Sequence, residues 1–275
     1  MIINTETKLF AILGHPIKQS LSPQIQNEWF KKEGLNCVYL AFDQDCDHLD
    51  EAVKAIKLFD FCGVNITVPY KIEIIKYVDF LDDIAMKIGS VNTLNFVNGK
   101  IHAYNTDYLG FTYDLLAKKV DLENKNVLVI GAGGSARAVI YSLKNKRVKK
   151  IYVANRTIKN ANRLANIFEL DVVNISNIDS IISDIDLLVN TSSCGLNDGD
   201  TLPFDSAIDV KDNLIVYDLI FNKSTPFVKF AKLKKLRIFT GEGMLIYQGA
   251  FGFKIWTGKY PDITIAENIL KKFVK

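Results

Sequence analysis

The sequence predicts an α/β protein that consists of an N-terminal α/β domain and a second, doubly wound domain of the Rossmann type. Two observations lead to this fold class. Strand-like and helix-like segments alternate through most of the 275 residues, and a glycine-rich turn near residue 131 joins an apolar strand to a helix. A chain of this length can form one large domain or two ordinary ones.

The first part of the chain is expected to form a mixed sheet. Apolar runs predict strands at 9–13, 38–42 and 63–68, with Pro69 ending the last one. Helices are expected from Ser22-Pro23 and near 49–58, with Ser22 as N-cap and Pro23 in the first turn. Asn98-Gly99 lies between apolar segments 91–97 and 100–104, which indicates an antiparallel hairpin.

The second part has the pattern of a parallel sheet with intervening helices. A helix is expected from Asp107 to about Lys119, and the last 33 residues from Gly243 look mostly helical with a break near 258–261. The expected strands are at 127–130, 150–154, 186–190, 214–218 and 237–239. We therefore predict domains at 1–105 and 106–242, with helices 243–275 joining the first and the active site in a cleft between them.

Composition narrows the class of protein. The net charge is only +3, from 34 basic and 31 acidic residues, which gives no reason to expect a nucleic-acid partner. No secretory signal or membrane-spanning stretch is recognisable, and four scattered cysteines with three histidines predict neither a zinc site nor a disulfide framework. We expect a cytoplasmic protein without a metal or a membrane partner, whose oligomeric state, monomer or homodimer, stays open.

The glycine-rich turn predicts a dinucleotide site. Its frame is G-x-G-x-x-A, and the segment comprises Gly131, Ala132, Gly133, Gly134, Ser135 and Ala136. Gly131 permits the tight turn, Gly133 lets the backbone approach a pyrophosphate, and Ala136 allows close packing of helix on strand. The helix N-terminus then offers N–H groups and a positive dipole end to phosphates.

The end of the next strand indicates which dinucleotide is used. Asn155-Arg156-Thr157 follows the strand 150–154, and no acidic residue is present to accept from a ribose 2′-hydroxyl. Arg156 can instead bind a 2′-phosphate and stack on adenine, which favours NADP over NAD. The alternative is a plain strand–turn–helix with a surface arginine.

Polar residues at predicted strand ends and helix starts suit a small polyhydroxylated ligand, and they are Ser20, Ser22, Asn65, Thr67, Lys71, Asn92, Asn105, Thr106, Asp107 and Gln248. Each has a simpler interpretation. Ser22 and Asp107 could only cap helices, and spacing alone favours that role for Ser22. Lys71 could be one solvated lysine among many, Asn92 could serve a turn, and Gln248 could lie on a helix surface.

Seven ordered segments together resemble the shikimate/quinate dehydrogenase family over nearly the whole chain. They are S-L-S-P at 20–23, N-I-T-V-P-Y-K at 65–71, G-S-V-N-T-L at 89–94, N-T-D-Y-L-G at 105–110, G-A-G-G-S-A-R at 131–137, N-R-T at 155–157 and G-M-L-I-Y-Q at 243–248. The resemblance implies reversible, NADPH-dependent reduction of 3-dehydroshikimate to shikimate, a step towards aromatic amino acids.

The resemblance also implies roles for individual residues. Lys71 and Asp107 would be the catalytic pair, because the alkoxide that forms when hydride adds to a ketone needs a proton. The substrate would contact Asp107 and a further set: Ser20, Ser22, Thr67, Asn92 and Gln248. The cofactor would contact the loop 131–136, Asn155, Arg156, Thr157, Leu219 and Gly241, with a weaker role for Asp83.

Two departures from the family pattern leave alternatives open. Phe221 stands where the family often has Tyr, so one hydroxyl contact to the substrate is missing. Asn160, beside Lys159, occupies a position where some NADP-specific members carry a second arginine. The alternatives are a quinate/shikimate dehydrogenase with relaxed cofactor use and a non-catalytic nucleotide-sensing protein on the same fold.

Overall fold

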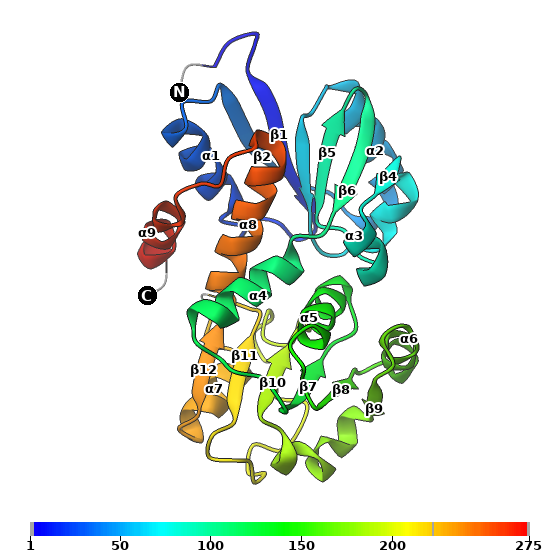
Figure 1. Ribbon diagram of the computed structural model, residues 1–275, viewed down its shortest axis with the longest axis vertical. Helices are drawn as coiled ribbons and strands as arrows, with labels where there is room; N and C mark the ends of the chain where they lie inside the picture. Colours follow the sequence, from blue (N-terminus) through cyan, green and yellow to red (C-terminus); the bar gives the residue numbers. More distant parts are fainter. Residues whose placement is uncertain (1–2, 222, 274–275) are drawn as a thin grey trace. The chain divides into compact units, whose positions relative to one another are not determined.

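The computed structural model describes residues 3–221 and 223–273, and its chain divides into two compact units (Figure 1). Unit 1 comprises Met1–Gly110 and Leu245–Lys275, and unit 2 comprises Phe111–Met244. Each unit contains one six-stranded sheet. The chain leaves unit 1 within helix α4 (Asp107–Ala117) and returns to it within helix α8 (Glu242–Thr257). The α/β class predicted from the sequence is confirmed.

The sheet of unit 1 has the strand order β2-β1-β3-β5-β6-β4. β1 pairs in parallel with β2 and β3, whereas β5 pairs antiparallel with both β3 and β6. The strands are β1 (Lys8–Gly14), β2 (Cys37–Asp43), β3 (Gly63–Ile66), β4 (Phe80–Leu81), β5 (Thr93–Val97) and β6 (Lys100–Tyr104). The other elements begun in this unit are α1 (Ser22–Lys32), η1 (Cys46–His48), α2 (Leu49–Leu58), η2 (Glu73–Tyr77), α3 (Asp83–Ile88) and α9 (Ile263–Phe273).

The predicted hairpin is the antiparallel part of this sheet. Asn98 and Gly99 both have positive φ angles, 51° and 73°, as the two central residues of a type I′ turn require. Val97 pairs with Lys100 across this two-residue turn. The turn sequence therefore sets the register of β5 and β6, and the two residues that follow Tyr104 lead into α4.

Two local predictions for unit 1 were wrong. β3 ends at Ile66 rather than at residue 68, because Thr67 begins a turn in which its carbonyl accepts a hydrogen bond from the Tyr70 N–H at 2.9 Å. Ser22 is the first residue of α1 and not its N-cap, which is Leu21 and makes no side-chain capping hydrogen bond. Its neighbour Pro23 lies in the first turn as predicted.

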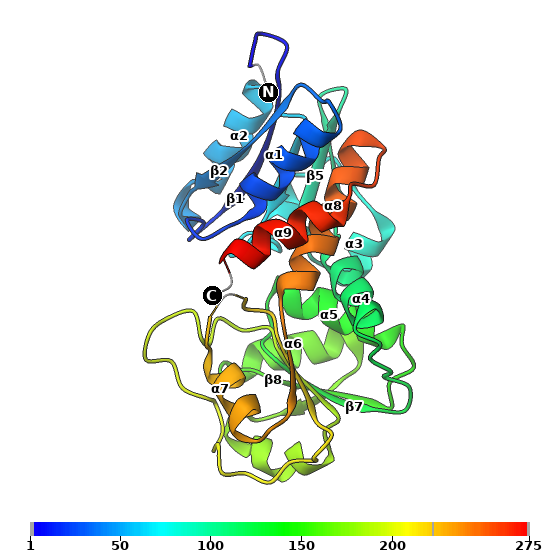
Figure 2. The ribbon, with the colours of Figure 1, turned by 90° about the vertical axis from the view of Figure 1, so that its left-hand side faces the viewer.

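The C-terminal helices belong to unit 1, where α9 packs beside α1 (Figure 2). Trp29 of α1 is fully buried, and its Nε1–H donates to the carbonyl of Asp262 at 2.9 Å. The rings of Trp29 and Phe253 of α8 meet edge to face, with centroids 5.8 Å apart. Aromatic packing of this kind holds the last two helices against the N-terminal part of the chain.

Unit 2 is a parallel sheet with the strand order β12-β11-β10-β7-β8-β9 (Figure 1). Its strands are β7 (Asn126–Ile130), β8 (Lys150–Ala154), β9 (Asp171–Val173), β10 (Leu187–Asn190), β11 (Ile215–Asp218) and β12 (Arg237–Thr240). Its other elements are α5 (Gly134–Lys144), α6 (Ile158–Phe168), η3 (Ile175–Ser180), η4 (Ile182–Asp184) and α7 (Pro226–Leu233). The chain runs outwards from β7 through β8 to β9 and then crosses to β10 on the other side of β7, so the topological switch point lies between β7 and β10.

Both faces of this sheet are buried. Along β7, Val127 and Val129 belong to one apolar cluster, whereas Leu128 and Ile130 belong to another. This alternation follows from the period of two residues in a strand. Because apolar layers cover both faces, only the two edges formed by the strand ends are left for a polar ligand.

A buried polar contact joins α4, β11 and the start of α8 within unit 2. Tyr217 of β11 donates its hydroxyl to Asp114 Oδ2 of α4 at 2.5 Å, and Lys118 pairs with the other carboxylate oxygen. Burial and the adjacent Asp114 raise the pKa of Tyr217 well above 10. A Cβ on Gly243 would overlap Asp114 Oδ1, so glycine at this position permits the close approach of α8 to α4.

Candidate active site

Lys71 and Asp107 form an ion pair in unit 1. Lys71 Nζ lies 2.7 Å from Asp107 Oδ2, and the two side chains are only 12% and 4% exposed. Lys71 comes from the turn after β3, while Asp107 is the first residue of α4. The interpretation of Lys71 as one solvated lysine among many was wrong. A nearly buried pair of this geometry presents an acid and its orienting carboxylate together.

Asn92 holds the other oxygen of this carboxylate. It is 2% exposed, and its Nδ2 donates to Asp107 Oδ1 and to Thr106 Oγ1, both at 2.9 Å. Its Oδ1 accepts from the Thr106 N–H at 2.7 Å. Gln248 of α8 reaches the same amide, with Oε1 3.2 Å from Asn92 Nδ2. Four of the predicted residues, Lys71, Asn92, Asp107 and Gln248, are therefore joined in one network.

Asp107 does not cap its own helix. Asn105 Oδ1 accepts from the backbone N–H groups of Asp107 and Tyr108 at 3.0 and 3.4 Å, and Asn105 Nδ2 donates to the carbonyl of Ser90 at 2.8 Å. The capping interpretation of Asp107 is wrong, since Asn105 performs that function. The carboxylate of Asp107 is thereby left for Lys71 and Asn92.

Asn65 and Thr93 form a layer beneath this network. Asn65 is 5% exposed, accepts from the Tyr39 hydroxyl at 2.7 Å, and donates to the carbonyl of Asn92 and to Thr93 Oγ1 at 3.0 and 3.1 Å. Its signal in the sequence was an asparagine within an otherwise apolar strand. Sequence reasoning noted Asn65 and missed its partner Tyr39.

The remaining predicted substrate residues lie after two neighbouring strands. Ser20 and Ser22 follow β1, Thr67 follows β3, and these strands pair in parallel with Leu13 opposite Ile66. Ser20 Oγ accepts from the Ser22 N–H at 3.3 Å. Ser20 and Thr67 are partly exposed, whereas Ser22 is 7% exposed. Thr67 directly follows the carboxyl end of β3, where ligands bind in such sheets.

The glycine loop of unit 2 has the backbone that a nucleotide turn requires. Gly131 has φ = +115°, and a Cβ there would overlap Thr191 Oγ1, so a side chain is excluded by conformation and by space. Gly133 is exposed and directly precedes α5, and no side chain caps this helix. Ala136 is fully buried against the sheet. A helix N-terminus that begins at such a turn points backbone N–H groups towards a phosphate.

The segment after β8 is more exposed to solvent than the glycine loop. Asn155 Nδ2 donates to the carbonyl of Thr157 at 3.0 Å, which shapes the turn into α6. Arg156 and Thr157 are exposed, and Thr157 occupies the N-cap position without a side-chain cap. No acidic residue follows β8 directly, as expected from the sequence. The exposed guanidinium of Arg156 fits a phosphate better than a ribose hydroxyl.

Leu219 and Gly241 follow β11 and β12 and lie against each other. A Cβ on Gly241 would overlap the carbonyl oxygen of Leu219, so only glycine permits this approach. Asp83 lies in unit 1 as the first, exposed residue of α3, and its neighbour Asp82 caps that helix through Ile84 N–H at 3.0 Å. The cofactor role of Asp83 stays a prediction.

Sequence reasoning missed a buried carboxylate at the switch-point edge of unit 2. Asp218 accepts hydrogen bonds from Asn190 Nδ2, the Ile220 N–H and Thr225 Oγ1 at 2.9, 3.1 and 2.5 Å. Burial raises the pKa of Asp218, while these hydrogen bonds lower it. The signal in the sequence was a polar residue closing each of two apolar runs. The network supports the loops that follow β10 and β11.

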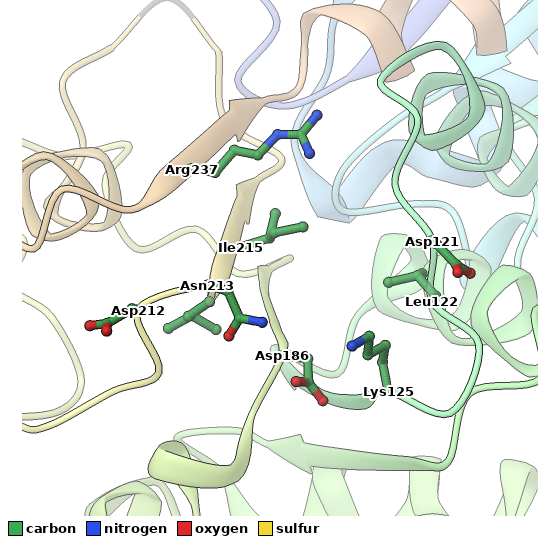
Figure 3. A pocket seen from close by; sticks show the side chains of 9 residues that line it. Asp121, Leu122, Lys125, Asp186, Asp212, Asn213, Ile215 and Arg237 are labelled. Carbon is green, nitrogen blue, oxygen red and sulfur yellow. The ribbon is translucent and has the colours of Figure 1, made fainter.

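The opposite edge of the unit 2 sheet has a pocket of about 320 Å³ (Figure 3). Asp121, Leu122 and Lys125 lie on one side of it, and Asn213 and Ile215 lie on the other. None of the predicted site residues lines this pocket. The predicted cofactor residues of this unit all follow the carboxyl ends of strands, so the candidate site and this pocket lie at different edges of the sheet.

Residues 3–221 and 223–273 offer neither a metal centre nor a membrane span. No group of three or more His, Cys, Asp or Glu side chains in that part of the chain could hold a metal ion. No helix in the same part is long and apolar enough to cross a membrane.

A doubly wound sheet with a glycine loop at its switch-point edge, preceded by an α/β unit with a buried Lys–Asp pair, defines a dinucleotide-binding α/β protein. Family models agree with this class and match three segments. They are the "Shikimate dehydrogenase substrate binding domain" at residues 12–94, "Shikimate / quinate 5-dehydrogenase" at 114–196 and the "Shikimate 5'-dehydrogenase C-terminal domain" at 241–271.

Relatives agree over the full length. The chain is 42% identical to the shikimate dehydrogenase (NADP(+)) of Aquifex aeolicus over 98% of both chains. The crystal structure of shikimate dehydrogenase from Aquifex aeolicus superposes with a TM-score of 0.92 at 41% identity, covering 98% of this chain and 100% of that one. Shikimate 5-dehydrogenase from Thermus thermophilus, in complex with NADP(H) and shikimate, gives 0.87 at 34% identity, covering 97% and 99%. The chain belongs to the shikimate dehydrogenase family.

Proposed function

We propose that this chain catalyses the reversible, NADPH-dependent reduction of 3-dehydroshikimate to shikimate, a step of aromatic amino acid biosynthesis. Membership of the family and the names of its relatives support this assignment. The observation that carries it is the nearly buried ion pair of Lys71 and Asp107, with 2.7 Å between Nζ and Oδ2. A nucleotide sensor would not need such a pair.

Proton transfer would be the task of Lys71. Reduction of a ketone leaves charge on the oxygen, and the Lys71 ammonium donates a proton to that oxygen as the charge develops. In the oxidation direction Lys71 takes the proton from the hydroxyl. Asp107 orients the Lys71 side chain, and Asn92 keeps the carboxylate of Asp107 in place through its other oxygen at 2.9 Å. Positioning of this kind lowers the entropic part of the barrier.

Substrate binding would use hydroxyls and amides of unit 1. Ser20 and Ser22 would donate to the carboxylate of shikimate, and Thr67, Asn92 and Gln248 would bind its ring hydroxyls. A site of fixed hydrogen-bond donors and acceptors rejects ligands that lack the matching groups. Phe221, which is partly exposed in unit 2, would supply an aromatic contact without a hydroxyl.

Cofactor binding would use the carboxyl edge of the unit 2 sheet. When bound, the nicotinamide supplies or accepts the hydride. The loop 131–136 would hold the pyrophosphate, since Gly133 is exposed and a Cβ there would meet no atom within 4 Å. Asn155, Arg156 and Thr157 would bind the adenosine end, where Arg156 favours NADP. Leu219 and Gly241 would border the nicotinamide end, and Asp83 is proposed to contribute from unit 1.

The test replaces the proton donor. Lys71→Ala should lower kcat for shikimate oxidation with NADP+ by at least about a hundredfold, because general acid–base catalysis typically contributes that much or more. The dissociation constant for shikimate should change much less. Lys76→Ala is the matched control, since Lys76 is 58% exposed and forms its ion pair with the neighbouring Glu73. An unchanged kcat in Lys71→Ala would refute the role.

Parallel assays with shikimate and quinate distinguish the alternative functions. Comparable turnover of both substrates would indicate a quinate/shikimate dehydrogenase. Binding of NADP+ without turnover of either substrate would favour the sensor. The cytoplasmic location expected from the sequence stays a prediction, and the choice between monomer and homodimer stays open.

A further inference from the structure

Arg137 is a buried cation in unit 2 that forms no ion pair with an acidic side chain of the described residues. It is 9% exposed, and its Nε atom is buried and has no hydrogen-bond partner among the described residues. Burial and, to a lesser degree, the nearby Arg163 lower the pKa of Arg137. A guanidinium stays protonated in proteins nevertheless. A buried, unpaired charge is costly, so a ligand that brings an anion to Arg137 would relieve this cost.

The position of Arg137 in α5 points to the mouth of the glycine loop. Its backbone N–H donates to the carbonyl of Gly133 at 3.2 Å, so it lies one turn into the helix. Side chains of a helix lean towards its N-terminus, which places the Arg137 side chain over the turn that starts at Gly133. Gly133 is exposed, and a Cβ there would meet no atom within 4 Å. The space beside Gly133 at this helix end is therefore open to a ligand.

Arg163 approaches from the neighbouring helix. α6 packs beside α5, and its buried face consists of Ala161, Leu164, Ala165 and Phe168. Arg163 is exposed and lies outside this face. It follows Asn160 by three residues, so the two share a side of the helix, and its long side chain leans back towards the first turn of α6. That turn begins directly after Arg156 and Thr157.

We propose that Arg137 and Arg163 complete, with Arg156, a binding site for the 2′-phosphate of NADP. The three cations come from α5, α6 and the turn after β8. A phosphate monoester carries nearly two negative charges near neutral pH and matches more than one guanidinium. Some NADP-specific family members carry a second arginine at the position of Asn160. In this chain, Arg163 would supply that positive charge from one turn later in α6. The proposal rests on the proposed use of NADP.

The 2′-phosphate is favoured over the pyrophosphate for a geometric reason. In a doubly wound fold the ribose 2′ position lies at the end of the second strand, which is β8 here. Arg156 and Arg163 both belong to the segment that follows β8. The pyrophosphate is bound by backbone N–H groups at the N-terminus of α5 and needs no cation from α6.

Direct binding measurements separate these possibilities. Isothermal titration with adenosine 2′,5′-bisphosphate and with NAD+ would be made on the wild type, Arg137→Met and Arg163→Gln. Each variant should weaken binding of the bisphosphate by at least about tenfold, since hydrogen bonds to charged groups contribute that much. Binding of NAD+, which lacks the 2′-phosphate, should change by less than about twofold.

Arg147→Gln is the matched control, because Arg147 is an exposed arginine in the turn between α5 and β8. It removes one positive charge from the same unit and should leave both constants unchanged. Equal weakening of bisphosphate and NAD+ binding would overturn the proposal in favour of a pyrophosphate contact. Should Arg137→Met fail to fold, the exposed Arg163→Gln variant still decides the question.

Failure of this proposal is distinguishable from failure of the proposed function. A wild type that binds no adenosine 2′,5′-bisphosphate would overturn the use of NADP, and this site with it. A wild type that binds the bisphosphate, together with unchanged binding in Arg137→Met and Arg163→Gln, would overturn only the arginine site.

Discussion

The predicted catalytic residues of unit 1 and the predicted cofactor contacts of unit 2 differ in burial. In unit 1, Lys71, Asn92 and Asp107 are nearly buried and hydrogen-bonded to one another. In unit 2, the predicted cofactor contacts Gly133, Arg156 and Thr157 are exposed. A proton donor must be held at a fixed position and orientation. A phosphate, in contrast, can be bound by exposed N–H groups and long cationic side chains. Substitutions in unit 1 should therefore change kcat, and those in unit 2 should change cofactor affinity.

The largest effect is expected from Asp107→Ala. It leaves the Lys71 ammonium nearly buried without its carboxylate and removes an acceptor of Asn92 Nδ2. We expect kcat to fall at least about a hundredfold while the dissociation constant for NADP+ stays within about twofold. Steady-state kinetics and cofactor titration measure the two quantities. A loss confined to NADP+ affinity would contradict the expectation that substitutions in unit 1 change kcat and those in unit 2 change cofactor affinity.

The next effect concerns the glycine loop. Gly131→Ala places a Cβ at φ = +115° that overlaps Thr191, so unit 2 must shift. We expect a loss of about 2 kcal/mol or more in the free energy of unfolding, together with weaker NADP+ binding. Gly99→Ala in the hairpin of unit 1 is the control, since it has φ = +73° but open space around the Cβ. Equal costs in urea unfolding would show that backbone conformation alone, and not the contact with Thr191, matters.

A smaller effect is expected for cofactor choice. Arg156→Gln should raise the KM for NADP+ about tenfold and leave the KM for NAD+ nearly unchanged, because only NADP carries the 2′-phosphate. kcat with NADP+ should stay within about twofold. Kinetics with both cofactors at saturating shikimate test this expectation. A similar rise for both cofactors would mean that Arg156 contacts a part that NAD and NADP share.

The smallest effect concerns the stability of the fold at low pH. Asp79 of unit 1 accepts from the Ile101 N–H at 2.9 Å and pairs with Lys100, which lowers its pKa from 3.8 to about 2. A carboxylate with a lowered pKa stabilises the fold above about pH 4, and this contribution is lost as the pH falls through about 2.

Asp79→Asn should therefore be less stable than the wild type at pH 6, and the difference should narrow as the pH falls towards 2. Thermal unfolding over this range measures it. A difference independent of pH would show that the Asp79 charge contributes nothing. Asp218 of unit 2 contrasts with it, because burial raises its pKa.

Local signals in the sequence were sufficient for most of the fold. Asn98-Gly99 predicted the hairpin turn, and the glycine frame predicted the β7–α5 connection, because turns and caps depend on a few adjacent residues. The strands β4 and β9 were missed, since two and three residues are too short for alternation to be recognised. The end of β3 was misplaced because a turn begins at Thr67, before the proline that was expected to stop the strand.

The candidate site could be predicted only in part. Lys71, Asn92 and Asp107 were found through their motifs, but neither their spacing nor their residue types showed that Asn105 caps α4 in place of Asp107. The buried network of Asp218 and the burial of Arg137 were missed. Burial depends on how elements distant in sequence pack, and a single residue type carries no sign of it.

The central claim is that a proton-transfer pair in unit 1 serves a reaction whose cofactor is selected in unit 2. The most direct test supplies the purified wild type with shikimate and either NADP+ or NAD+ and follows the absorbance of the reduced nicotinamide. The account predicts rapid turnover with NADP+ and little with NAD+. Folded protein that binds NADP+ and turns over shikimate with neither cofactor would contradict it.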